Sequence, residues 1–385
     1  MKFVISGGGT AGHIYPAIAV AHELAERGHE VVFAGTPEGL EAKLVPAAGF
    51  PFTAFDVSGF NRNHPLTLVK SSMKALKSSS KAKKWLKEIG ADAVVGFGGY
   101  VSIPVGRGAA DLGIPLVIHE QNSACGMANK YLAPHASAVA LTYEVAGKEL
   151  SANCPVTVTG NPVRPEIGAV DATTAREILK VPSDALLLLV FGGSLGARHI
   201  NTVISALASE LLGIEGLRIL HVTGPKEYDT VKAALDEAGV ATCGPGFSPE
   251  GGWEGDAQAR YMLTGYFEHM GEALAAADAI VSRAGATSLA EITTVGAAAL
   301  LVPYPYATDD HQTKNAQALV DSGASLMCPD DQVEEPVFAE KLLALLSDGD
   351  RREEMRRMTR ELGRVDAAAR VADIAEEAAR KTATK

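Results

Sequence analysis

The residues of this chain best suited to chemistry are a glycine-rich loop near its start and the histidine that ends the loop. Residues 7–13 (GGGTAGH) follow a short apolar run at residues 2–6 and precede residues 16–27, which have the pattern of a helix. Small residues let the backbone come close to a ligand, and the first turn of a helix offers unpaired N–H groups. Strand, glycine loop and helix in this order predict a phosphate site at the start of the helix.

The glycine spacing, Gly7-x-Gly9-x-x-Gly12, matches the fingerprint of dinucleotide-binding folds. That fingerprint also needs an acidic residue at the end of the second strand, where it binds a ribose hydroxyl. Here the second strand is expected to end at residues 33–36 (FAGT), which include no acid. A nicotinamide cofactor is therefore disfavoured, whereas a purely structural glycine turn stays open as an alternative.

His13 is the candidate catalytic base. It lies where the helix begins, so its side chain can face the crevice beyond the strand ends, where open α/β sheets bind ligands. A neutral histidine, with an ordinary pKa of about 6.5, is the usual general base near neutral pH. The alternative is a histidine that caps the helix or packs in the core.

A second constellation, residues 282–291 (SRAGATSLAE), follows an apolar strand predicted at residues 279–281. Its small residues open a helix, so their N–H groups and the hydroxyls of Thr287 and Ser288 suit a pyrophosphate. Glu291 lies about one helical turn further on and is placed to accept hydrogen bonds from ribose hydroxyls. The alternative for Glu291 is a charge interaction with the helix N-terminus, but its place beside a phosphate-type loop favours ribose binding.

A third glycine loop, residues 192–196 (GGSLG), follows the apolar run at residues 185–191. Both halves of the chain thus repeat the plan of strand, glycine loop and helix, which predicts a ligand held between two domains. A dehydrogenase usually has its cofactor loop in one half only. In the first half, residues 119–122 (HEQN) end a further predicted strand. Four successive polar residues there indicate a ligand cleft, with a solvated loop as the alternative.

Two stripes at helical spacing run through residues 66–88. The basic stripe contains Lys70, Lys74, Lys77, Lys81 and Lys84. The apolar stripe beside it contains Leu66, Val69, Met73 and Leu76, with Trp85 and Leu86 beyond. A helix of this kind between Leu66 and Leu86 fits the surface of an anionic membrane. The alternative is a helix that packs its apolar side on the sheet and solvates its lysines.

Length and composition fit two globular domains. The chain has 385 residues, of which 47% are hydrophobic and 21% are charged. Alternating strands and helices predict parallel sheets with helices on both faces. The rigid turn at residues 160–165 (GNPVRP) indicates a domain boundary. Residues 243–258, rich in glycine and acid, are expected to form a mobile loop insertion.

Charge and cysteine usage exclude several classes of function. The formal net charge is −11, so we expect no nucleic acid partner, because phosphate neutralisation needs a basic surface. The 4 cysteines are scattered without a C-x-x-C pair, which predicts neither a zinc site nor a disulfide framework and fits a reducing cytoplasm. No apolar stretch approaches the roughly 20 residues that a membrane-spanning helix needs.

Six segments together resemble the MurG family of glycosyltransferases and occur in that family's order. They are residues 8–13 (GGTAGH), 98–102 (GGYVS), 119–122 (HEQN), 160–164 (GNPVR), 192–197 (GGSLGA) and 282–286 (SRAGA). No single segment is decisive, but six in order are highly specific. The resemblance implies an α/β chain with the GT-B fold, in which two Rossmann-like parallel-sheet domains face a central cleft.

The resemblance also implies how the chain is divided and what it does. Residues 1–163 would form the acceptor-binding, membrane-facing domain, with a helix at about 366–385 packed back on it, and residues 164–365 the UDP-GlcNAc-binding domain. The implied reaction is inverting transfer of N-acetylglucosamine from UDP-GlcNAc to the C4 hydroxyl of MurNAc in lipid I, which forms lipid II for peptidoglycan. No cofactor or metal is implied. The implied location is peripheral, on the cytoplasmic face of the cell membrane.

Site residues follow from the same resemblance. On the donor side, Arg164 and Ser194 would meet the diphosphate, the backbone of Phe267 the uracil, and Gln312 the sugar. The nucleotide would be lined by Ala286, Thr287, Ser288, Leu289 and Ala290, with Glu291 as the ribose anchor. On the acceptor side, the implied contacts are Thr10, Ala11, Gly12, His13 and Asn122.

Two features depart from the family pattern. Ala11 stands where glycine is common, which adds a methyl group near the implied pyrophosphate of the acceptor, and residues 243–258 are longer than expected before Phe267. Three other readings stay open. They are another GT-B nucleotide-sugar enzyme such as a UDP-GlcNAc 2-epimerase, a nicotinamide dehydrogenase, and a non-catalytic sensor of nucleotide sugars.

Overall fold

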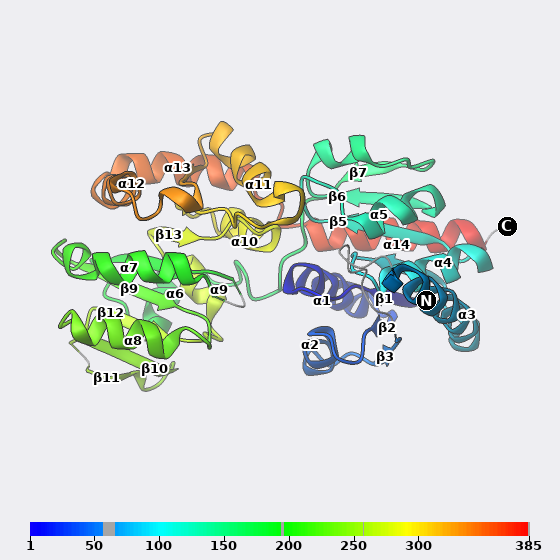
Figure 1. The fold of residues 1–385 in the computed structure, drawn as a ribbon, viewed down its shortest axis with the longest axis horizontal. Helices are drawn as coiled ribbons and strands as arrows, with labels where there is room; N and C mark the ends of the chain where they lie inside the picture. The colour runs from blue at the N-terminus through cyan, green and yellow to red at the C-terminus, as the bar shows by residue number, and fades with distance from the viewer. Residues whose placement is uncertain (57–65, 194–195, 257, 384–385) are drawn as a thin grey trace. The chain divides into compact units, whose positions relative to one another are not determined.

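The chain divides into two compact units in the computed structural model. It describes residues 1–56, 66–193, 196–256 and 258–383, with the backbone alone for residues 66–77 and 383 (Figure 1). Unit 1 consists of residues 1–164 and 364–385, and unit 2 of residues 165–363.

Unit 1 is built on a parallel sheet of seven strands. Their order across the sheet is β3 (Phe52–Ala54), β2 (Glu30–Gly35), β1 (Lys2–Ser6), β4 (Ala93–Gly96), β5 (Leu116–Glu120), β6 (Ala138–Leu141) and β7 (Val156–Val158). Every neighbouring pair is parallel. The central strands are short runs rich in valine and isoleucine and are buried, as strands covered on both faces must be. The strand order reverses between β1 and β4, and open α/β sheets bind ligands at such a point.

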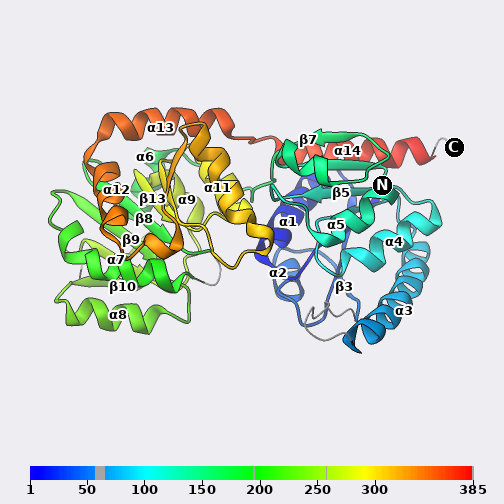
Figure 2. The ribbon, with the colours of Figure 1, turned by 45° about the horizontal axis from the view of Figure 1, so that its top comes forward.

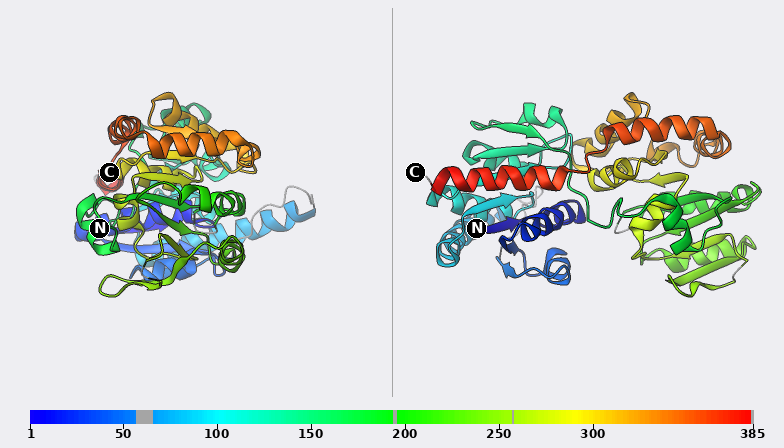
Figure 3. Two further views of the ribbon diagram at one scale, coloured as in Figure 1. Left: turned by 90° about the vertical axis from the view of Figure 1, so that its left-hand side faces the viewer. Right: turned by 180° about the vertical axis from the view of Figure 1, so that it is seen from behind.

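Helices cover both faces of this sheet. On one face α1 (Ala11–Glu26) packs with α14 (Ala367–Ala383), the last helix of the chain (Figure 3). Arg27 ties the two helices together through ion pairs with Asp373 and Glu376. The other face is covered by α3 (Leu66–Ile89), α4 (Ser102–Leu112) and α5 (Met127–Leu132), as Figure 2 shows. The short helix α2 (Glu41–Ala47) follows β2 and contacts β3.

The described half of α3 packs on the sheet. Leu86 and Ala82 are fully buried, and the ring of Trp85 meets that of Phe55 edge-on with centroids 5.3 Å apart. For Trp85 and Leu86, the packing alternative is therefore the correct one, because the apolar side of the helix covers the core. The side chains of residues 66–77, which carry most of the lysine stripe, lie outside the described residues.

Unit 2 holds an eight-stranded sheet. Its order is β11 (Gly252–Gly255), β10 (Thr242–Ser248), β12 (Tyr261–Thr264), β9 (Leu217–Val222), β8 (Leu186–Phe191), β13 (Ala279–Ser282), β14 (Ala299–Leu301) and β15 (Ser325–Met327). All neighbours are parallel except β10 and β11. The order reverses between β8 and β13, so this sheet has its own ligand-binding switch point.

Helices also cover both faces of the second sheet. One face is packed by α7 (Arg198–Leu211), α8 (Tyr228–Glu237) and α12 (Pro336–Ser347). On the opposite face lie α6 (Ala172–Leu179), α9 (Met270–Ala276) and α10 (Ala286–Val295). Two further helices, α11 (His311–Asp321) and α13 (Gly349–Leu362), pack on β15 and α10 respectively. Among the described residues, no helix is both long and apolar enough to cross a membrane.

The prediction that residues 243–258 form a loop is wrong for most of that segment. Strands β10 and β11 form an antiparallel hairpin at the edge of the sheet, with Phe247 directly opposite Trp253. The two rings lie 5.0 Å apart, and the indole N–H of Trp253 donates to the carbonyl of Leu179 at 3.3 Å. The glycine-rich composition is typical of a loop and hid this hairpin, which the cross-strand pair of Phe247 and Trp253 helps to stabilise.

Candidate active site

The first glycine loop lies at the switch point of the unit 1 sheet. Residues 7–10 connect the carboxyl end of β1 to α1, and residues 97–101 follow the neighbouring strand β4. Thr10 is the N-cap residue of α1, with an extended backbone at φ −142° and ψ 154°. The predicted order of strand, glycine loop and helix is therefore present. The helix begins earlier than predicted, at Ala11 instead of residue 16, and this start places His13 in the first turn of α1.

His13 is held by its Nδ1 atom. This nitrogen lies 3.0 Å from the carbonyl oxygen of Gly8 and 3.2 Å from Oγ1 of Thr10. A carbonyl oxygen can only accept, so Nδ1 must carry the hydrogen in this arrangement. In the neutral ring Nε2 then bears the lone pair, and Nε2 is the atom with which His13 would act as a base.

The glycine pair at residues 98–99 makes room for this arrangement. Both have positive φ, +92° for Gly98 and +79° for Gly99, a conformation that side chains rarely adopt. A Cβ atom at Gly98 would lie 3.2 Å from Nε2 of His13, and one at Gly99 would overlap the carbonyl oxygen of Gly8. These two glycines therefore let the segment after β4 lie close to both the His13 ring and the Gly8 carbonyl that holds it.

Glu41, which the sequence did not single out, organises the same loop. Its side chain is 1% exposed and accepts hydrogen bonds from the backbone N–H of Gly9 at 3.1 Å, the N–H of Thr36 at 2.9 Å and the hydroxyl of Thr36 at 2.7 Å. Burial alone would raise the pKa of this carboxyl, but the bonds from Thr36 and Gly9 outweigh it and lower the pKa. The N–H of Gly9 is thus already satisfied, which leaves fewer loop amides for a phosphate than the sequence predicted.

The polar segment at residues 119–122 belongs mainly to the interior, so the expectation that it lines a cleft is wrong for its first three residues. His119, Glu120 and Gln121 are 0%, 2% and 1% exposed. His119 donates from Nε2 to the carbonyl of Gly160 at 3.0 Å and accepts at Nδ1 from Gln121 at 3.1 Å. Burial lowers the pKa of His119 to about 4, so it is a neutral structural residue.

Glu120 fixes the turn that presents Asn122. Its carboxylate accepts from the backbone N–H of Asn122 at 3.1 Å, the N–H of Gly126 at 2.9 Å and the side-chain amide of Asn129 at 2.9 Å. Asn122 itself is half-buried, the one residue of the four that retains an accessible side chain. Polar residues buried at a strand end resemble cleft residues in sequence, because only the fold reveals the backbone groups they satisfy.

Arg164 lies at the end of unit 1. Its guanidinium stands 4.7 Å from the centre of the Tyr15 ring, a cation–π contact with α1. Ser194, the other residue expected to meet the diphosphate, lies outside the described residues. The flanking Gly193 and Gly196 both have positive φ, and Gly196 packs so closely that a Cβ atom would overlap the carbonyl of Thr223.

The start of α10 lies at the switch point of unit 2, as the sequence predicted. Gly285 is its N-cap residue with φ −65° and ψ 142°, and Ala286 begins the helix. Within the described part of the chain, the buried Oγ1 of Thr287 has no hydrogen-bond partner. Glu291 is 5% exposed and Leu289 1%, while Ser288 and Ala290 are half-buried. A buried hydroxyl without a partner in the first turn of a helix suits a ligand oxygen.

The side chain of Gln312 presents a hydrogen-bond donor near the N-cap of α10. Its Oε1 accepts from the backbone N–H of Ala284 at 3.2 Å and of Tyr304 at 2.9 Å. Two N–H donors on one atom identify it as the oxygen, so the amide nitrogen faces the other way. A Cβ atom at Gly285 would lie 4.0 Å from this nitrogen. Gln312 therefore offers N–H groups beside the start of α10.

Arg283, in contrast, is structural although it stands in the same motif. It is 9% exposed and donates to the carbonyls of Val302 at 3.2 Å and Pro303 at 3.1 Å, and it pairs with Asp330. Asp330 also accepts from Nδ1 of His199 at 3.0 Å. This network joins the end of β14 to the beginning of α7.

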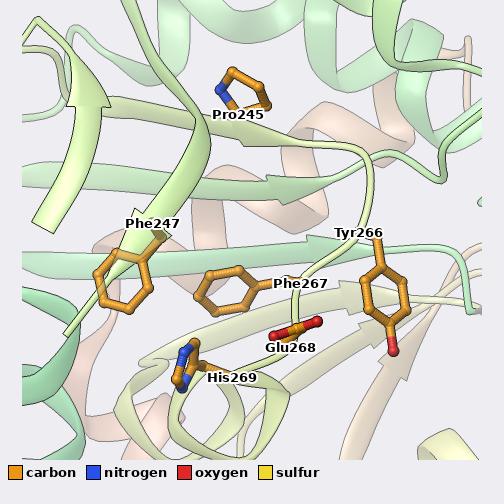
Figure 4. A pocket seen from close by; sticks show the side chains of 6 residues that line it. All are labelled: Pro245, Phe247, Tyr266, Phe267, Glu268 and His269. Carbon is orange, nitrogen blue, oxygen red and sulfur yellow. The ribbon is translucent and has the colours of Figure 1, made fainter.

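Phe267 forms one wall of a pocket at the carboxyl end of β12 (Figure 4). The pocket has a volume of about 210 Å³ and is lined by Pro245, Phe247, Tyr266, Phe267, Glu268 and His269. The Phe267 ring is stacked on Trp253 with centroids 5.2 Å apart and planes 15° apart. The hairpin at residues 242–255 thus supplies both an aromatic support for Phe267 and a wall of the pocket. No group of three or more potential metal ligands occurs among the described residues.

Comparisons with known proteins agree with this geometry. The glycosyltransferase family 28 N-terminal domain matches residues 3–141, and its C-terminal domain matches residues 187–377. A protein of Desulforamulus reducens is 39% identical over 369 residues, 95% of this chain and 96% of its own. One of Leuconostoc mesenteroides is 40% identical over 350 residues, 90% of each chain. Both are named UDP-N-acetylglucosamine–N-acetylmuramyl-(pentapeptide) pyrophosphoryl-undecaprenol N-acetylglucosamine transferase.

Solved structures confirm the predicted GT-B fold. The crystal structure of Acinetobacter baumannii MurG has a TM-score of 0.75 at 30% identity and covers 98% of this chain and 99% of its own. The calicheamicin glycosyltransferase CalG4, at 17% identity and a TM-score of 0.64, shares the fold alone. The chain therefore belongs to glycosyltransferase family 28 and, within it, to the MurG family that its sequence motifs resemble.

Proposed function

We propose that this chain transfers N-acetylglucosamine from UDP-GlcNAc to the C4 hydroxyl of MurNAc in lipid I, with inversion, to form lipid II. The observation that carries the proposal is the sequence identity of 35–40% to transferases of that name along 90% or more of the chain. The glycine loops at the two switch points add physical support, since each opens where an α/β sheet binds its ligand.

Unit 2 is the proposed donor site. The N-terminus of α10 would bind the diphosphate through its amides and the Thr287 hydroxyl, with Gln312 donating from its side-chain nitrogen. Glu291 would accept hydrogen bonds from the ribose. The pocket beside Phe267 has aromatic walls that suit a flat base such as uracil. Arg164 and Ser194 would complete the diphosphate contacts, as the family resemblance implies.

Unit 1 is the proposed acceptor site, with His13 as base. Thr10, Ala11, Gly12 and Asn122 would bind the acceptor, and Nε2 of His13 would take the proton of the C4 hydroxyl as its oxygen attacks C1 of the sugar. The C1–oxygen bond to UDP breaks in the same step, so no covalent enzyme intermediate forms. The negative charge on the leaving diphosphate would be stabilised by the α10 N-terminus. We expect this stabilisation to make a metal unnecessary, and activity retained in EDTA would support that expectation.

The proposal includes peripheral binding to the cytoplasmic face of the membrane through α3. Leu86 and Trp85 pack inward, so we assign the apolar part of the membrane contact to the first half of the helix, where Lys70, Lys74 and Lys77 lie. Each basic residue near an anionic surface contributes about 1 kcal/mol, so K74E with K77E should weaken binding to phosphatidylglycerol vesicles by at least about 10-fold. The matched control is K226E with K314E, two exposed lysines of unit 2. Equal binding by both double variants would exclude this helix as the contact.

The transfer itself is tested with labelled UDP-GlcNAc and a lipid I analogue. The proposal predicts label in a product with the mass of lipid II, formed only when the acceptor is present, with one UDP released per sugar transferred. A UDP-GlcNAc 2-epimerase would instead convert the nucleotide sugar without any acceptor. A sensor would bind UDP-GlcNAc and release no UDP. Either of these two results would refute the proposed reaction.

A further inference from the structure

We propose that Glu41 is a positioning residue that orients and activates His13 through the peptide group between Gly8 and Gly9. The inference rests on the proposed role of His13 as the base of the transfer reaction. It assigns a function to a buried carboxylate that no sequence motif included.

The geometry joins three groups in a line of hydrogen bonds. Oε2 of Glu41 accepts from the N–H of Gly9 at 3.1 Å, and the carbonyl oxygen of Gly8 accepts from Nδ1 of His13 at 3.0 Å. This N–H and this carbonyl belong to one planar peptide group and point in opposite directions. The carboxylate therefore acts on one end of a rigid dipole, and the imidazole is bound to the other end.

The carboxylate is fixed in place. Its second oxygen, Oε1, accepts from both the N–H and the hydroxyl of Thr36. Three glycines, Gly8, Gly35 and Gly39, pack closely around this carboxylate. A Cβ atom at any of these positions would lie 2.5 Å or less from the Glu41 side chain, too close for two non-bonded atoms. Three neighbouring positions without side chains thus leave a space that the Glu41 carboxylate fills.

The peptide is held from its other side as well. Gly99 packs against the Gly8 carbonyl so closely that a Cβ atom there would overlap its oxygen. With Glu41 at its N–H end and Gly99 beside its carbonyl, the peptide group has little freedom to rotate. The direction of the Gly8 carbonyl, and with it the tautomer and orientation of the His13 ring, is therefore determined by Glu41.

The charge of Glu41 adds a second effect. Hydrogen bonds in a chain polarise one another, so an anion at the N–H end makes the Gly8 oxygen a stronger acceptor. A stronger acceptor favours the Nδ1–H tautomer, which leaves Nε2 free of a proton and ready to take one. It also stabilises the imidazolium that forms when Nε2 takes the acceptor proton. In serine proteases a carboxylate orients the catalytic histidine by direct contact. Here a peptide group stands between the two.

The test compares Glu41→Gln with Glu38→Gln, an exposed carboxylate in the segment just before α2. Loss of the charge should reduce kcat by roughly 10- to 100-fold, less than the loss from a directly bonded carboxylate, with the KM for UDP-GlcNAc changed less than about twofold. Glu38→Gln should match the wild type. If Glu41 acts through His13, Glu41→Gln should change kcat less than about twofold in the His13→Ala background. Equal losses in both backgrounds, or no loss in either, would overturn the proposal.

A measurement without substrate separates this inference from the proposed function. In ¹⁵N-labelled protein, the imidazole shifts of His13 should show a protonated Nδ1 and an unprotonated Nε2, and Glu41→Gln should mix the tautomers. If Glu41→Gln does not fold, Thr36→Val is the substitute, because it removes one bond to Oε1 and should cause a smaller change in the same direction. An Nε2–H tautomer in the wild type would refute the relay even in an active transferase. Absence of transfer by a protein with the expected tautomer would instead refute the proposed function.

Discussion

Replacing Trp253 by alanine should weaken the binding of UDP although Trp253 is not among the residues that line the pocket. The indole is stacked on Phe267 at 5.2 Å and donates to the carbonyl of Leu179 at 3.3 Å. An aromatic pair contributes about 0.5–1.5 kcal/mol beyond its burial, and a hydrogen bond a further 0.5–1.5 kcal/mol, so the hairpin loses about 1–3 kcal/mol. If about half of this free energy stabilises the Phe267 conformation that binds UDP, its loss raises the Kd for UDP about 2- to 12-fold.

Calorimetric titration with UDP measures this effect, and the chain supplies its own control. It has 2 tryptophans, and the other, Trp85, meets Phe55 edge-on in unit 1. Trp85→Ala removes a comparable aromatic pair and should leave the Kd for UDP within about twofold of the wild type. In Trp85→Phe, Trp253 is the single tryptophan of the chain, and its emission should change when UDP binds. A Trp253→Ala protein that is less stable but binds UDP with unchanged affinity would refute the assignment of this pocket to the base.

Three further predictions concern the base, the ribose and pH. His13→Ala should lower kcat by about 10²- to 10⁴-fold with the donor KM nearly kept, and near-normal turnover would remove His13 from this role. Glu291→Ala should raise the KM for UDP-GlcNAc by about 10-fold, and an unchanged KM would count against ribose binding. Burial lowers the pKa of His119 to about 4 and that of His221 to about 3. The unfolded chain therefore binds protons below pH ~6.5 that the folded chain does not, and urea unfolding should show stability falling by about 1.6 kcal/mol for each histidine between pH 6.5 and 5. Equal stability at pH 6.5 and 5 would contradict this burial effect.

Local sequence patterns were sufficient to predict parallel sheets, several of their central strands and the glycine loops that follow those strands. Apolar runs such as residues 185–191 have few uses other than a buried parallel strand, and a glycine loop after such a run has few places to lie. The start of α10 followed directly, whereas α1 begins at Ala11, within the segment predicted as a glycine loop. These features depend on neighbours in the chain, which is why a single sequence reveals them.

Features that depend on distant contacts were missed. Glu41 has no distinguishing local pattern, and its importance comes from Gly9 and Thr36, which the fold brings to it. The sequence pattern of His119 and Gln121 is typical of a cleft, because their partners, among them the carbonyls of Gly160 and Phe97, come from segments that follow other strands. The hairpin around Trp253 was hidden by glycine content, since its stability comes from aromatic packing between segments.

A crystal structure with UDP-GlcNAc bound is the most direct test of this account. We predict that the uracil lies against Phe267, that the ribose hydroxyls reach Glu291, and that the diphosphate meets the amides at the start of α10 beside the side-chain nitrogen of Gln312. Density for the nucleotide at residues 7–12 of unit 1, with the start of α10 unoccupied, would contradict it.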